Sequence, residues 1–107
     1  MNQEQLDKEL ILKCESGTLE EVQNLIKQGA NVNTEDGCRN TPLHNACRNE
    51  NIDLAVIKFL VENDANVKAK GEFDCTPLHY ACRNNNTNVD IIKFLVENKA
   101  TVNYKDK

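Results

Sequence analysis

Several residue types are scarce in this sequence of 107 residues. It has no tryptophan, one methionine, two prolines, four glycines and only five aromatic side chains. No apolar run approaches the roughly 18 residues that cross a bilayer. The first five residues, MNQEQ, are polar and acidic, unlike the basic and apolar start of an export signal. We therefore expect neither a membrane-spanning segment nor a targeting peptide.

Positive charge is scarce as well. Thirteen lysines and arginines face 17 acidic residues, which gives a net charge of −4, and the basic residues form no cluster. Binding to nucleic acid or to anionic lipid depends on clustered Lys and Arg. We therefore expect no nucleic-acid partner and no membrane partner. The 39% of hydrophobic and 28% of charged residues are ordinary for a soluble domain.

Cysteine, in contrast, is frequent. The five cysteines are Cys14, Cys38, Cys47, Cys75 and Cys82. Their number is odd and no Cys-x-x-Cys pair occurs, so the sequence predicts free thiols rather than a disulfide framework. Free thiols are typical of a reducing compartment. We expect an intracellular protein, in the cytoplasm.

An internal repeat of 35 residues is the main feature of the chain. Residues 41–49, TPLHNACRN, return at 76–84 as TPLHYACRN, and the segment IKFLVEN occurs twice. Residues 41–72 laid over 76–107 give 19 identities in 32 pairs. A fainter copy precedes these two, because residues 28–33 match the corresponding stretches of both. The sequence predicts one domain, residues 1–107, of three units at about 4–36, 37–71 and 72–107.

Each unit has the pattern of two short helices followed by a loop. Thr41 and Thr76 are favoured N-cap residues, and the proline after each suits the first helical position. His44 and His79 then stand at the third helical position, where a capping-box partner lies. Apolar residues follow at i, i+3 and i+4, as on one face of a helix. Glycine, aspartate and asparagine between the units predict turns or short hairpins. The sixteen asparagines do not indicate disorder, because the apolar periodicity around them is regular.

The motif Thr-Pro-Leu-His-x-Ala at Thr41–Ala46 and Thr76–Ala81 resembles the signature of ankyrin repeats. The resemblance covers nearly the whole chain. It implies an all-α solenoid of stacked helix-turn-helix units, with β-hairpin-like loops that project sideways and a concave face. It further implies that partner proteins bind through the hairpin tips and the exposed side of the first helices. By position these candidate partner-binding residues are Gly37, Cys38, Asn40, Asn45, Arg48, Asn49, Glu72, Phe73, Cys75, Tyr80, Arg83 and Asn84.

The sequence departs from the family pattern in three places. Arg39 and Asp74 stand where the family usually has a glycine, so the hairpin tips are expected to differ in shape. The two residues beyond the usual spacing of 33 fall in 48–53 and 83–90, which predicts longer connections within the helix pairs. The first unit lacks the motif, with Lys-Glu-Leu-Ile at 8–11.

The two ends of the array also differ. The first unit has polar residues for an outer face, as a terminal repeat needs. The last unit repeats the apolar residues of an internal one, including Phe94 and Val96, and shows no C-terminal cap. The pattern predicts a monomer or weak self-association through this repeat. A fragment of a longer array is the alternative.

His44-x-x-Cys47 and His79-x-x-Cys82 are the only candidates for chemistry. Two such pairs on stacked helices could hold zinc or act as nucleophile and base. The histidines, however, belong to the helix-start motif, and the cysteines stand where the family places a small core residue. We therefore expect no metal, no cofactor and no catalytic residue. A disulfide between Cys38 and Cys75 is conceivable, since both lie in hairpin segments.

The sequence thus predicts a non-catalytic module that binds a partner protein, of acidic or polar character where it faces Arg48 and Arg83. Tyr and Arg are frequent in binding hot spots, and Phe73 and Tyr80 stand out among few aromatics. The same residues could instead serve packing, with Tyr80 between repeats and Phe73 folded over its hairpin. A structural spacer in a larger protein and a Cys/His metal or redox module are the alternative functions.

Overall fold

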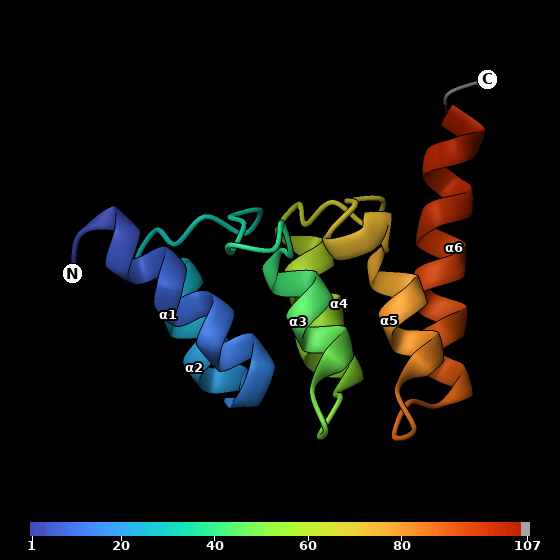
Figure 1. Cartoon of the computed structure of the whole chain (residues 1–107), viewed down its shortest axis with the longest axis horizontal. Coiled ribbons are helices and arrows are strands. Elements are labelled where there is room, and N and C mark those ends of the chain that lie inside the picture. The colour runs from blue at the N-terminus through green and yellow to red at the C-terminus, as the bar shows by residue number, and fades with distance from the viewer. Residues whose placement is uncertain (106–107) are drawn as a thin grey trace.

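The computed structural model describes residues 1–105, and the side chains of residues 1–98. Three helix pairs stand side by side (Figure 1), and no strand occurs among the described residues. The predicted all-α fold is confirmed. The expected hairpin-like loops are turns, one of which contains a short 3-10 helix. The elements are α1 Gln3–Ser16, α2 Leu19–Lys27, α3 Pro42–Arg48, α4 Leu54–Glu62, η1 Glu72–Asp74, α5 Pro77–Arg83 and α6 Val89–Lys105.

Side chains at the helix starts fix where each helix begins. Thr41 and Thr76 accept a hydrogen bond from the backbone N–H of the histidine three residues later. Each histidine ring accepts the threonine N–H in return, at 3.0 and 2.9 Å. Asn2 and Thr18 form the same reciprocal pair with a Gln or Glu. The capping boxes expected at His44 and His79 are therefore present, and they satisfy helix N–H groups that have no partner within the helix.

The core lies between the helix pairs. The first helices α1, α3 and α5 pack in that order, and behind them α2, α4 and α6 do the same. The largest buried apolar side chains come from every pair, including Leu10, Leu43, Ile57, Leu60 and Ile91. Because no single pair could bury its apolar stripe alone, each repeat is stabilised by its neighbours.

Asparagines join the repeats at both ends of the helix pairs. In the connection 49–53, Asn49 donates to the Cys14 carbonyl at 3.2 Å. One repeat later, Asn84 donates to the carbonyl of Cys47 at 2.9 Å. At the opposite end, Asn33 accepts the backbone N–H of Asn66 at 2.8 Å. These bonds give the asparagine-rich composition a structural role, since an amide side chain both donates and accepts.

The last helix is longer than its counterpart in the second unit. Helix α4 ends at Glu62, whereas α6 continues to Lys105, through the residues that the repeat predicts to be a loop (Figure 1). Gly29 and Asp64 follow α2 and α4 with φ of 104° and 74°, the left-handed conformation that commonly ends a helix. The third unit has Lys99 at the equivalent position. A lysine is less suited to that conformation, so the stop signal is weaker there.

The loop tips carry backbone strain where the family pattern has glycine. Arg39 and Asp74 have φ of 71° and 58°, and Phe73, which precedes Asp74, has a φ of 57°. A side chain with a Cβ is disfavoured in this region by about 1–2 kcal/mol. The Arg39 guanidinium lies 3.8 Å from the Asp74 carboxylate, but both are largely exposed, so this pair contributes little in compensation.

Replacing Arg39 with glycine is therefore expected to raise the free energy of unfolding by about 0.5–1 kcal/mol, because glycine adopts positive φ at no steric cost. The measurement is urea unfolding followed by circular dichroism. Arg39→Ala is the matched control, since it removes the same ion pair but keeps a Cβ at the strained position. Equal stabilities for the two variants would show that backbone strain is not the cause.

Candidate functional site

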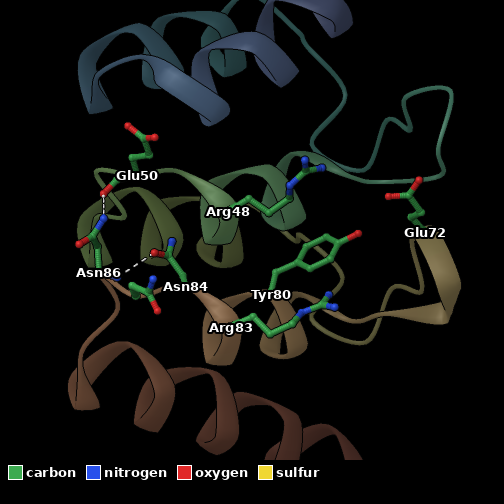
Figure 2. Close-up of a pocket in the computed structure, with 8 residues that line it drawn as sticks. Arg48, Glu50, Glu72, Tyr80, Arg83, Asn84 and Asn86 are labelled. Carbon is green, nitrogen blue, oxygen red and sulfur yellow. Dashed lines mark hydrogen bonds between the residues drawn. The ribbon is translucent and has the colours of Figure 1, made fainter.

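The first helices of the second and third repeats carry two exposed arginines, one repeat apart. Arg48 is the last residue of α3 and Arg83 the last of α5. Both helices begin with the same capped Thr-Pro motif, so they end in register and present the arginines from equivalent positions. Tyr80 comes from the middle of α5 and lies between them (Figure 2). The repeat period alone thus brings the two cations to one aromatic ring.

The Tyr80 side chain contacts Asn40 and His44 on its buried side and lies between two cations. It is 8% exposed, and its hydroxyl donates to the Asn40 Oδ1 at 2.9 Å. The His44 ring meets it edge-on at 5.3 Å between ring centres. The guanidinium carbons of Arg48 and Arg83 lie 5.5 and 5.1 Å from the ring centre, within the range of a cation–π interaction. Burial raises the pKa of Tyr80, so its hydroxyl remains a donor.

A hollow of about 500 Å³ opens over this group. Glu50 lies toward one end of the hollow and Glu72 toward the other, with the arginines and Tyr80 between them (Figure 2). Asn84, Asn85 and Asn86 complete the lining. Asn86 donates to the Glu50 carbonyl at 2.8 Å, which connects the two repeats along the floor. A hydrogen bond between the repeats therefore holds the backbone beside the hollow, and charged side chains line its surface.

The loop tips project beyond the hollow. Phe73 is 90% exposed and directly follows Glu72, which lines the hollow. Gly37 and Cys38 are exposed at the preceding tip. The Glu72 carboxylate raises the pKa of the Cys38 thiol, so these two groups are near one another across the loops. The alternative in which Phe73 folds over its own hairpin does not match its exposure.

Two of the candidate residues are buried, and two others join neighbouring repeats. Asn40 and Asn45 are each 1% exposed and cannot touch a partner directly, which corrects the expectation for both. Asn49 and Asn84 are half-buried, and their amides hold neighbouring repeats together. The signature predicts which positions lie near the concave face, but it does not distinguish a side chain that points out from one that spans the repeat interface.

Cys75 and Tyr80 have mixed roles. The Cys75 carbonyl accepts the His44 Nε2–H at 2.8 Å, and its half-buried thiol accepts from Arg83 Nη2 at 3.3 Å. Tyr80 packs between repeats, as one of the two alternatives for it stated, and exposes only a small part of its ring. Both residues support the arginines more than they extend toward a partner.

The described residues form three stacked helix pairs, and a hollow lined by side chains lies on one face. A family model described as ankyrin repeats, in three copies, matches residues 10–106. The chain belongs to the ankyrin-repeat family. Ankyrin repeats are generally protein-interaction modules, and ankyrin domains are typically non-catalytic. No curated protein matched the chain.

Three members of the histidine and cysteine columns of this ankyrin domain, His44, Cys14 and Cys47, are buried in the core. Both ring nitrogens of His44 are engaged, by Thr41 and by the Cys75 carbonyl. Burial raises the pKa of Cys14 to about 12 and that of Cys47 further. No three His, Cys, Asp or Glu side chains within the described residues converge as metal ligands do.

Cys82 departs from its column. We expected it on the packed stripe with Cys47, but it is exposed, because among the described residues no helix pair covers the outer face of α5. His79 is exposed for the same reason, whereas its counterpart His44 is fully buried. On α6, Val96 is 45% exposed.

Among residues 1–105, no helix combines the length and apolar character needed to cross a membrane.

Two residues of the site were missed by sequence reasoning. Gly71 is buried, and a Cβ there would overlap the Asn40 Oδ1 and come within 3.0 Å of His44 Nε2. Glu50 lines the hollow from the connection after α3. The residue type at each position differs between repeats, since Asp36 corresponds to Gly71 and Asn85 to Glu50. A search for identities between repeats therefore had no signal for them.

Proposed function

We propose that this ankyrin domain is a non-catalytic binding module that holds a partner protein along the surface from the Phe73 loop tip to the hollow over Tyr80. The main support for this proposal is the exposure and the backbone conformation of Phe73. Its ring is 90% exposed and its backbone has a φ of 57°. Neither feature stabilises the fold, and strained residues with exposed side chains are typical of binding sites.

The surroundings of Phe73 support the same surface. Glu72 connects the tip to the hollow, where Arg48 and Arg83 are exposed beside Tyr80. Arginine and aromatic side chains contribute strongly at protein interfaces. The capped helices and the hydrogen bonds between repeats hold these groups in place before a partner arrives, so little conformational entropy is lost on binding. Gly37 and Cys38 extend the proposed surface across the neighbouring tip.

The test is capture of a partner from cell extract by the immobilised chain, followed by titration of the captured protein. Phe73→Ala is expected to weaken binding by about tenfold or more, as loss of a central aromatic contact does. Val89→Ala is the matched control, because Val89 is also an exposed apolar residue, at 77%, but lies at the start of α6 away from the tip. The fold of each variant is checked by circular dichroism.

Equal losses for both variants would place the contact elsewhere. If no protein is captured, or if capture is insensitive to Phe73, the alternative of a structural spacer within a larger protein is favoured. A loss specific to Phe73 supports the binding module and locates its face.

A further inference from the structure

The two arginines of the hollow are held in place but have unused hydrogen-bond donors. Each guanidinium carries five N–H groups. Within the described residues, Arg48 makes no hydrogen bond or ion pair, and Arg83 donates only to the Cys75 thiol. Arg39, the one other arginine, is paired with Asp74. The acidic chain thus leaves two of its three arginines available at one site.

Tyr80 orders these two side chains. Its ring cannot rotate freely, because the hydroxyl donates to Asn40 and the ring edge contacts His44. Arg48 and Arg83 flank this fixed ring (Figure 2). Ordering a long side chain costs conformational entropy, and the contacts with Tyr80 already restrict both arginines in the folded chain. A ligand that enters the hollow over the Tyr80 ring meets donors in a preset arrangement.

The carboxylates at the two ends limit what this ligand can be. Glu50 and Glu72 line the same hollow as Arg48 and Arg83, so the four ionised groups sum to zero charge. A single carboxylate at the centre is attracted by both arginines. A run of acidic residues also extends toward Glu50 and Glu72 at the two ends of the hollow, and like charges repel one another. The arrangement favours one negative charge with none beside it.

We propose that the hollow recognises an extended segment of a partner protein through one acidic side chain, bound over Tyr80 by Arg48 and Arg83 and flanked by uncharged or basic residues. This inference rests on the proposed binding function and gives that function a chemical specificity. The flanking positions face Glu50 and Glu72, which a lysine of the partner can satisfy. Charge-assisted hydrogen bonds to the two arginines supply the attraction.

The experiment titrates the full chain, labelled with ¹⁵N, with blocked Gly-Ser peptides that differ at the centre, and follows the side-chain Nε–H signals of the three arginines by NMR. The central residues are Glu, Gln, Lys-Glu-Lys and Glu-Glu-Glu. At millimolar peptide, the Glu and Lys-Glu-Lys peptides are expected to shift the Arg48 and Arg83 signals while Arg39 stays unchanged. The Gln and Glu-Glu-Glu peptides are expected to bind at least about tenfold more weakly than the Glu peptide.

Variants identify the groups responsible. Arg83→Gln and Arg48→Gln keep a polar side chain but remove the charge, and each is expected to reduce Glu-peptide binding about tenfold. Arg39→Gln is the control and is expected to leave binding unchanged. The inference is overturned if the Glu and Gln peptides bind equally, if Glu-Glu-Glu binds most tightly, if Arg39 responds like the others, or if no peptide shifts Arg48 and Arg83.

The result is separable from that of the binding function itself. A captured partner that depends on Phe73 but whose affinity is unchanged by Arg48→Gln and Arg83→Gln supports the module and overturns the acidic specificity. A Glu-selective response at the two arginines supports the specificity even before a natural partner is known.

Discussion

Replacing Gly71 with alanine is expected to lower the free energy of unfolding by about 2–3 kcal/mol, a large part of the stability of a domain of this size. The added methyl group would overlap the Asn40 Oδ1 and crowd His44 Nε2. Asn40 is 1% exposed, and this oxygen accepts both the Tyr80 hydroxyl and the Glu72 N–H. The clash therefore breaks buried hydrogen bonds, which costs more than the contact itself.

Gly37→Ala is the matched control for this substitution. Nothing lies within 4 Å of a Cβ added at Gly37, so its effect is expected to be within about 0.5 kcal/mol. Urea unfolding of Gly71→Ala, Asn40→Ala and the double variant then forms a cycle. If the overlap is the cause, the double variant is less destabilised than the sum of the two single ones. An additive result would contradict this account of Gly71.

The second large effect is expected from the two histidines, which occupy the same motif position in different surroundings. His44→Ala is expected to destabilise the chain by about 3 kcal/mol, because it leaves a buried cavity and removes the bond to the Cys75 carbonyl. His79→Ala loses only the exposed cap and is expected to cost about 1 kcal/mol or less. Similar losses in denaturant unfolding would mean that capping, and not burial between repeats, determines the role of His44.

The burial of His44 predicts that the free energy of unfolding depends on pH. Burial lowers the pKa of His44 in the folded state, against a smaller opposing effect of its backbone partners and of Asp36. The unfolded chain takes up this proton near pH 6.5 and the folded chain resists it. Stability from neutral His44 is therefore fully present above about pH 6.5 and is lost as the pH falls, by at most about 1.4 kcal/mol per pH unit. Unfolding measured from pH 7.5 to 5.5 is expected to show a flatter dependence in His44→Ala than in His79→Ala.

The fold was predictable because its signals are local and repeated. Helix starts follow from a capping threonine, a proline and a histidine, which interact within one turn. Gly29 and Asp64 end their helices by their own backbone preference. The lengthened connections at 49–53 and 84–88 follow from the spacing of the motif. The end of α6 was not predictable by copying the previous repeat, because Lys99 replaces the residue that ends α4.

The candidate site was predictable only as a region. Arg48 and Arg83 are at the surface as expected, but Asn40 and Asn45 occupy neighbouring positions and are buried. Tyr80 and Phe73 are both aromatic residues at expected binding positions, yet one packs against His44 and the other is exposed. Exposure depends on the side chains of the adjacent repeat, which the motif itself does not contain.

By itself, the sequence determined the 35-residue period, the helix starts, the family and the face on which a partner is expected. The tertiary structure alone decided which side chains that face presents. Identical motifs give His44 in the interior and His79 at the surface, and Cys47 in the core and Cys82 exposed. The physical reason is that capping and helix formation involve atoms within a few residues, whereas burial depends on whether another repeat packs against the same atoms.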